Sequence, residues 1–209
     1  MRSPLVAARA TPPGEQFQKA AGEYIEGLLQ AHPEYATELG DHRFDDRLTD
    51  YSNEALAKEL ARAKQFRQQL EAFNDLSQLT GANKVDVRLL KDSIDNEIFG
   101  LEALKERECN PLVYNQSLAN SIYLLVARDF APDDQRLTSA RKRMEAIPAA
   151  IAQAKANLKN PPKIFTETAI EQAAGSISLI REGLNPLFEQ APQLRKELAP
   201  LQEKTAVAL

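Results

Sequence analysis

The chain has 209 residues, of which 43% are hydrophobic and 27% are charged, and its formal net charge is −4. This length is ample for one large hydrophobic core or two small ones. The mildly acidic balance argues against a general nucleic-acid binder, because such proteins usually carry a clearly basic domain or stripe. No apolar run approaches the ~20 residues that a membrane-spanning helix needs. We therefore predict neither a nucleic-acid partner nor a membrane span.

Residues 1–14 are predicted to form a disordered lead-in. The apolar run Leu5–Ala8 is shorter than the ~7–15 residues of a signal-peptide core, so it is either the end of a removed leader or a flexible start. The cluster Thr11–Gly14 favours irregular backbone. Residues 15–209 are predicted to form a single all-helical domain. Cys109 is the only cysteine, so a disulfide within the chain is impossible.

Apolar residues recur at helical spacing along most of the chain, and proline, glycine and capping residues divide the pattern into separate helices. The run Ile122–Val126 could be read as a strand, but the sequence offers no partner strand, so we predict a buried helix there. The predicted fold class is all-α: about eight helices in an irregular antiparallel bundle, with one long helical hairpin and no sheet. The predicted helices cover residues 15–31, 33–39, 53–76, 83–108, 111–127, 132–158, 166–183 and 192–209.

Several helix ends carry clear local signals. Pro33 suits the first turn of a helix, where its missing N–H group costs nothing, and Gly40 suits a left-handed helix stop. Ser52 and Asn83 are placed as N-caps of the two helices of the hairpin. Pro148 lies inside an apolar helical pattern and predicts a kink or a short break.

The segment Gly40–Leu48 concentrates charged and aromatic side chains between two predicted helices. Its acids could bind a cation or line a substrate cleft, although their spacing does not match the calcium-loop pattern. The simpler interpretation is that the acids pair with Arg43 and Arg47 and hold the loop in shape. The candidate substrate-binding residues of this segment are Asp41, His42, Asp45, Asp46 and Arg47.

Two further features allow both a structural and a functional interpretation. Tyr114 follows the turn at Asn110-Pro111. Its side chain either points into a cleft, as a sixth candidate for substrate binding, or is buried with a hydrogen-bonded hydroxyl. Four cationic residues further along the chain are expected to form a solvated face of one helix: Arg136, Arg141, Lys142 and Arg143.

No complete active site is visible in the sequence. Zinc hydrolases that bind the metal on one helix use the pattern His-Glu-x-x-His, because residues four apart share a helix face, and this pattern is absent. His32 and His42 would reach a common metal ion only together with a carboxylate supplied by the fold. No nucleophile elbow, phosphate-binding glycine loop or dinucleotide fingerprint occurs. We therefore assign no catalytic residue and no metal ligand.

A series of short segments keeps the order found in a known family. The run Pro33–His42 is followed by Asp45–Leu48 and Tyr51-Ser52. Later segments agree in the same order: Val85–Leu90, Asn110–Leu112, Pro132–Leu137, Arg143–Pro148, Asn157-Leu158 with Pro161-Pro162, Thr168–Ile170 and Gly175. Together they resemble the bacterial family catalogued as domain of unknown function 885. The resemblance covers nearly the whole chain from residue 16 onward.

The resemblance implies a helical protein related to zinc-dependent peptidases. Members of the family are longer than this chain, and their later part carries a His-Glu-x-x-x-Pro-Gly-His segment that is similar to the zinc-binding helix of metallopeptidases. Many members look exported or lipid-anchored. This sequence lacks the His-Glu segment, so the resemblance transfers no catalytic residue and no zinc ligand to it.

On this basis we expect the N-terminal cleft wall of a zinc-dependent peptidase-like hydrolase, inactive by itself. Zinc would belong to the full-length protein, the partner would be its C-terminal half, and the substrate would be a peptide. The apolar end Ala206–Leu209 has no terminating signal, as expected for a piece of a longer protein.

Two alternatives remain open. The first is a self-sufficient helical module for binding or scaffolding. It differs from a truncated half in exposed surface, because a truncated half should display an unusually large apolar patch, through which homo-oligomers could also form. The second is an independent metal site built from His32, His42 and nearby aspartates.

Overall fold

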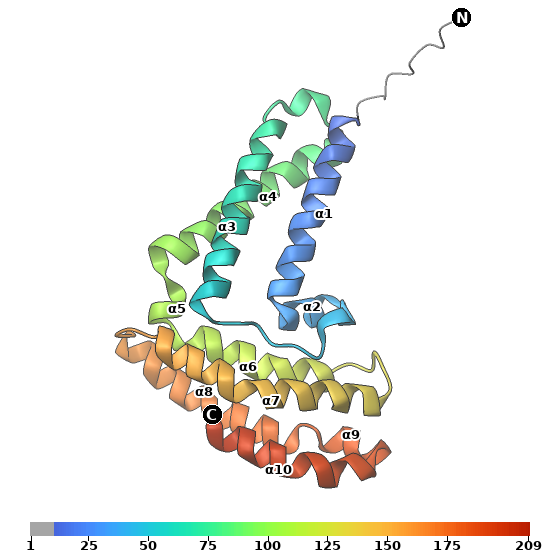
Figure 1. Ribbon diagram of the computed structural model, residues 1–209, viewed down its shortest axis with the longest axis vertical. Helices are drawn as coiled ribbons and strands as arrows, with labels where there is room; N and C mark the ends of the chain where they lie inside the picture. The colour runs from blue at the N-terminus through green and yellow to red at the C-terminus, as the bar shows by residue number, and fades with distance from the viewer. Residues whose placement is uncertain (1–10) are drawn as a thin grey trace, which may run out of the picture.

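The computed structural model describes residues 11–209, and within that range every regular element is a helix (Figure 1). The predicted all-α fold class is thus confirmed. None of the described helices is both long and apolar enough to cross a bilayer. The α-helices are α1 (Pro13–Ala31), α2 (Pro33–Leu39), α3 (Asn53–Gln69), α4 (Gly81–Phe99), α5 (Glu106–Cys109), α6 (Pro111–Val126), α7 (Asp133–Asn157), α8 (Lys163–Glu182), α9 (Asn185–Gln190) and α10 (Pro192–Ala208).

The predicted lead-in and the first helix overlap slightly. Helix α1 begins at Pro13, two residues earlier than expected, because proline at the first helical position loses no hydrogen bond. Residues 1–10, which make up most of the predicted lead-in, lie outside the described residues.

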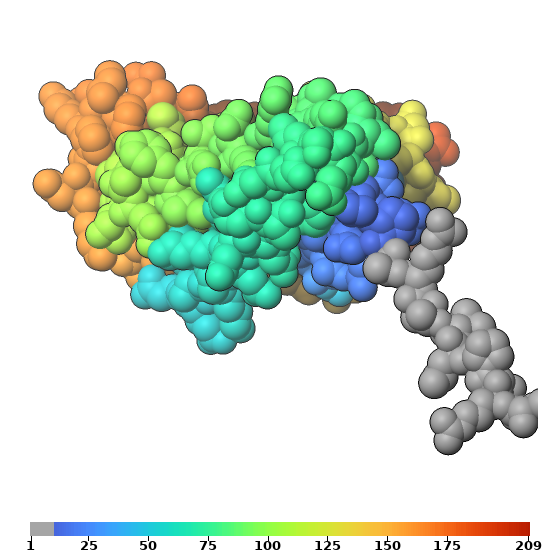
Figure 2. Space-filling model, turned by 90° about the horizontal axis from the view of Figure 1, so that it is seen from above, coloured from blue at the N-terminus to red at the C-terminus, as the bar shows by residue number. Residues whose placement is uncertain are grey.

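Buried hydrophobic side chains gather mainly in two separate clusters. One cluster lies among α6 to α10, and the other lies among α1, α3 and α4. Figure 1 shows the consequence: α1, α3 and α4 stand on a layer formed by α6 to α10, and α2 lies at the junction. Figure 2 looks down from the α1, α3 and α4 side, where α8, in orange, reaches beyond these helices at one edge.

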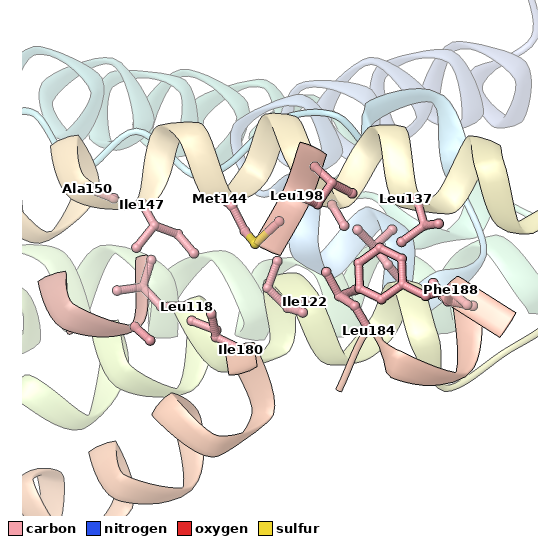
Figure 3. Packing of buried hydrophobic residues seen from close by; sticks show 14 of the residues in the cluster. Leu118, Ile122, Leu137, Met144, Ile147, Ala150, Ile180, Leu184, Phe188 and Leu198 are labelled. Carbon is pink, nitrogen blue, oxygen red and sulfur yellow. The ribbon is translucent and has the colours of Figure 1, made fainter. Parts of the chain in front are cut away.

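The C-terminal core is built from residues at helical spacing on facing helices (Figure 3). Leu118 and Ile122 of α6 meet Met144 and Ile147 of α7 in the larger cluster, and Ile180 of α8 joins them. Four of these five side chains are fully buried, and Leu118 is 3% exposed. Burial of that extent stabilises by about 1.5–3 kcal/mol for each large apolar side chain.

Aromatic pairs join α1 to α3 and to the 3₁₀ turn that follows α3, Leu70–Phe73. The rings of Tyr24 and Phe66 stack at 4.6 Å, which joins α1 to α3. Phe17 meets Phe73 edge to face at 5.5 Å. Ile94 of α4 completes this second cluster and is fully buried. Helix α1 therefore packs against the predicted hairpin of α3 and α4, and the three helices form one unit.

Most local signals act as expected. Ser52 caps α3, with its hydroxyl accepting from the N–H of Ala55 at 3.1 Å. Gly40 ends α2 in the left-handed conformation, with φ at +89°. Pro148 is an exception to the predicted break, because α7 continues through it as one helix.

Two details of the hairpin differ from the prediction. Thr80, not Asn83, caps α4; its hydroxyl accepts from the N–H of Asn83, which is buried in the first turn. The α-helical geometry ends at Phe99 and passes into a π-helical turn, Gly100–Leu104. Lys105 follows with φ at +50°, a conformation that non-glycine residues adopt rarely. This irregular stretch directs the chain into α5.

Candidate functional site

The first half of the Gly40–Leu48 loop is held by an ionic bridge. Asp41 accepts from the N–H of Arg43 at 3.2 Å and starts a short 3₁₀ turn, His42–Phe44. The Arg43 guanidinium also contacts Glu26 of α1 at 2.7 Å. The hydrogen bonds that Arg43 donates hold the pKa of the Asp41 carboxyl below the usual range. Arg43 therefore ties the loop to α1 through these two carboxylates.

His42 and Asp45 form a second fixed pair. The Nδ1 atom of His42 lies 3.0 Å from Oδ2 of Asp45, and the imidazole ring stacks on Phe130 with 3.7 Å between ring centres. Asp45 is buried and accepts a hydrogen bond from the Thr37 hydroxyl at 2.7 Å. Both side chains therefore have structural partners.

Asp46 and Arg47 connect the loop to α7. Asp46 accepts from the ammonium group of Lys142 at 2.8 Å, and this hydrogen bond lowers the pKa of the Asp46 carboxyl. The Arg47 carbonyl accepts from Nε of Arg143 at 3.0 Å. The Arg47 guanidinium lies over the Phe44 ring, 5.4 Å from its centre. Arg43 and Arg47 contact acids of the loop, as the simpler interpretation expected. Lys142 also pairs with Asp46, and His42 forms a hydrogen bond with Asp45.

Two of the four cationic residues expected on a solvated face are buried instead. Arg143 is fully buried, and it donates to the carbonyl of Ser121 and to the hydroxyl of Thr37, each at 2.7 Å. Arg136 is 3% exposed and donates to the Arg128 carbonyl at 2.9 Å. The prediction was wrong for both because these acceptors come from other parts of the chain.

The burial of Arg143 has an electrostatic consequence. Burial lowers the pKa of its guanidinium, and the charges of Glu34 and Asp45 oppose that effect. A sequence signal for the burial was available, because Arg143 lies at helical spacing with buried residues of the core face of α7: Arg136, Ala140 and Ile147.

Tyr114 is buried as in the second alternative, although it also lines an apolar hollow of about 310 Å³ between α6, α7 and α8. It is 3% exposed, and its hydroxyl donates to the Arg107 carbonyl at 2.6 Å. Its ring meets Tyr51 edge to face at 4.9 Å. The hydroxyl is thus engaged in fixing α5 against α6.

A cluster of His32, Glu59 and Arg107 joins α3 to the residue that follows α1 and to α5. No sequence motif indicated this cluster. Glu59 contacts Nε2 of His32 at 3.1 Å and Nη2 of Arg107 at 2.7 Å, with its own side chain only 9% exposed. Burial by itself raises the pKa of Glu59, but the hydrogen bond from His32 and the charge of Arg107 prevail and hold it below the usual value.

The structure also contains a groove that follows the exposed face of α6. Three adjoining hollows compose it, and we call them together the α6 groove. The first, about 270 Å³, lies between α3, the end of α4 and α5. The second, about 440 Å³, lies between α2 and α6, and the third, about 430 Å³, lies between α6 and α8. Val113 lines the first two hollows, and Gln116 and Asn120 line the second and third.

Hydrogen-bonding but uncharged side chains dominate the third hollow of the α6 groove, whereas charged residues also line the first two, among them Lys105 and Glu38. Gln116 and Asn120 of α6 face Gln172 of α8, and none of the three amide groups has a hydrogen-bond partner among residues 11–209. Glu34 lines the second hollow, but its carboxylate already accepts from the backbone and the hydroxyl of Thr49, at 3.1 and 2.6 Å. The groove therefore offers free amides to a ligand.

The predicted site residues and the α6 groove occupy different places. No residue of the Gly40–Leu48 loop lines any of the three hollows, and neither does Tyr114. No sequence pattern indicated the groove, because its walls come from α2 to α6 and from α8, which are far apart in the chain.

Zinc does not fit the side chains present in the described part of the chain. Between residues 11 and 209, no group of three or more His, Cys, Asp or Glu side chains is arranged to hold a metal ion. His32 pairs with Glu59, whereas His42 pairs with Asp45. The two histidines thus form separate hydrogen-bonded pairs instead of one shared site.

These features define an all-helical protein with a buried ionic junction and a polar surface groove. A family model described as "Bacterial protein of unknown function (DUF885)" matches residues 33–209, and the chain belongs to this family. The resemblance found in the sequence is thereby confirmed.

One solved structure has the same fold over almost the whole chain. It is described as "a putative lipoprotein of unknown function" from Shewanella oneidensis, with a TM-score of 0.73 and 25% sequence identity. The match covers 95% of this chain and 37% of the other, so this chain spans little more than a third of that protein's length. A comparison with curated proteins found no match.

Proposed function

We propose that this chain forms a helical cleft wall of a zinc-dependent, peptidase-like hydrolase and has no catalytic activity by itself. The observation that carries the proposal is the α6 groove, whose second and third hollows are lined by free hydrogen-bonding groups. Membership of the DUF885 family supports it, together with the greater length of the Shewanella protein that shares the fold.

The proposal assigns the metal to the rest of the protein. The described residues hold no suitable donor set, so the part played by this chain is to bind and orient a substrate. Peptides fit such a groove because amide side chains match the donors and acceptors of a peptide backbone.

An apolar face on α4 provides a surface for further protein. Val85, Leu89 and Phe99 are 54–60% exposed, and their spacing puts them on one side of the helix. The C-terminal half of a longer protein is the partner that we propose for this face, and a second copy of the chain is the alternative.

The description of the Shewanella protein as a lipoprotein supports an exported or lipid-anchored location for this protein. Fractionation of the source bacterium with an antibody against residues 11–209 tests this part of the proposal. We expect the antigen in the periplasmic or membrane-associated fraction, and recovery in the cytoplasm alone would contradict it.

The decisive experiment uses the complete open reading frame that encodes this chain. We expect the purified product to contain zinc by elemental analysis and to cleave members of a peptide panel in a chelator-sensitive manner. The 209-residue chain should do neither. A complete product without zinc and without hydrolysis would exclude the enzymatic proposal.

A self-sufficient binding module is the second candidate. The observation that favours it is that Gln116, Asn120 and Gln172 already bring three unbonded amides to one stretch of surface. An open reading frame that stops after Leu209, with a product that is folded and monomeric, would support the module over the cleft wall.

A further inference from the structure

We propose that the α6 groove binds the backbone of an extended peptide, with Gln116 and Asn120 as its main hydrogen-bonding residues. This inference rests on the proposed function only in taking a peptide as the ligand. It assigns the binding site to the exposed face of α6, away from the charged loop Gly40–Leu48.

The chemistry of the two side chains matches a peptide unit. Each primary amide provides two N–H donors and one carbonyl acceptor, and neither amide is used within the described part of the chain. Gln116 is exposed and Asn120 is half-buried, so a ligand can reach both. The backbone of a bound peptide would satisfy the hydrogen bonds of both amides, and neither the amides nor the backbone would carry a charge.

The spacing of the two residues matches an extended chain. Residues four apart in an α-helix are separated by about 6 Å along the axis, and alternate residues of a strand are separated by about 6.6 Å. Gln116 and Asn120 can therefore contact alternate residues of one peptide from the same side. Gln172 of α8, on the opposite wall of the third hollow, can contact the other edge of that peptide.

The lack of charge in the third hollow favours the middle of a peptide over its ends, because no charged residue lines it. In the second hollow, the Glu34 carboxylate is already bonded to Thr49, and His32 is paired with Glu59. Glu38 also lines the second hollow and is exposed, so the preference for the middle of a peptide applies to the third hollow. The first hollow lies beyond the amides of Gln116 and Asn120 and combines apolar lining from Leu56, Leu101 and Val113 with charged residues.

The test measures peptide binding to the complete protein by fluorescence anisotropy. The probe is a fluorescein-labelled hexapeptide of alternating alanine and serine, with both ends blocked, and EDTA is present to prevent metal-dependent cleavage. A second probe carries N-methyl groups on alternate peptide bonds. An unlabelled cello-oligosaccharide serves as competitor, because an amide-lined groove could also receive a sugar.

The variant is the double substitution Gln116→Ala with Asn120→Ala. Its matched control is Gln65→Ala with Gln68→Ala, which removes two exposed amides without hydrogen bonds from α3. We expect the first pair to weaken binding by about tenfold or more, N-methylation to act similarly, and the control to leave binding unchanged. Thermal unfolding of each variant verifies that it is folded.

Three results would overturn the inference: no peptide binding by the wild-type protein, equal affinity of both double variants, or displacement of the peptide only by the sugar. The outcome separates this inference from the proposed function. Binding that depends on Gln116 and Asn120 without any hydrolysis supports the peptide site and contradicts the enzyme. Hydrolysis with an unchanged KM in the Gln116/Asn120 variant supports the enzyme and contradicts the site.

Discussion

The Nη2 atom of Arg143 lies 2.7 Å from the hydroxyl oxygen of Thr37, although 106 positions separate the two residues in the chain. The same guanidinium donates to the carbonyl oxygens of Ser121 and Arg47. One fully buried side chain therefore links α2, the following loop, α6 and α7. This link lies where the upright helices meet the C-terminal layer, so it helps to set the orientation of the α6 groove walls.

The first prediction concerns that link. Arg143→Met should lower the free energy of unfolding by about 3 kcal/mol, because several buried acceptors lose their donor at once. Urea denaturation followed by circular dichroism measures the change. The control is Arg141→Met on the same helix, where the side chain is exposed and pairs only with surface glutamates; little change is expected. Equal stability of the two variants would mean that the network is dispensable.

The second prediction concerns pH. The pKa of Glu59 is lower in the folded protein than its usual value of 4.5. The ionised carboxylate therefore stabilises the fold fully above pH 4.5, and this contribution is lost as the pH falls through the lowered pKa. Glu59→Gln should reduce stability at pH 7 and flatten its decline in acid, measured by urea midpoints between about pH 3 and pH 7. Glu54→Gln, on the exposed side of α3, should keep the wild-type profile.

The third prediction separates structure from ligand binding at Tyr114. Tyr114→Phe should reduce the free energy of unfolding by about 1 kcal/mol, because the Arg107 carbonyl loses its hydrogen bond. It should leave peptide affinity unchanged. Tyr123→Phe removes a hydroxyl from a side chain that is 52% exposed and should alter neither quantity. A large loss of peptide affinity in Tyr114→Phe, with normal stability, would restore the substrate-binding interpretation.

The fourth prediction compares two glycines. Gly40 has φ at +89°, whereas Gly22 lies in the middle of α1, where a methyl group in place of its hydrogen would meet no atom within 4 Å. Gly40→Ala should destabilise by about 1 kcal/mol through left-handed strain, and Gly22→Ala should stabilise by about 0.5–1 kcal/mol through helix propensity. Thermal unfolding measures both. Shifts of the same sign would contradict this account.

Local sequence signals proved reliable at helix ends where a single residue fixes the backbone conformation. Pro33 and Gly40 delimit α2 at the predicted residues, and Ser52 caps α3 as expected. These choices depend on a missing N–H group, a missing Cβ atom and a nearby hydroxyl, and all three act within one helical turn. The sequence alone also excluded a complete zinc motif on a single helix.

Long-range packing decided the features that sequence reasoning missed. Arg143 looked solvated because its neighbours in sequence, Arg141 and Lys142, are charged, whereas its burial depends on acceptors from α2 and α6. The cluster of His32, Glu59 and Arg107 likewise gathers three distant segments.

Which features the sequence could predict depends on how far apart in the chain the interacting residues lie. By itself, the sequence determined the helical class, most helix ends and the family resemblance, because each depends on short segments. Only the tertiary structure decided which charges are buried, that the Gly40–Leu48 loop is tied down by ion pairs, and that free amides line a groove on α6. Burial and ion pairing arise between residues that meet only when the chain is folded, so a short segment shows at most that a position such as Arg143 lies on the core face of its helix.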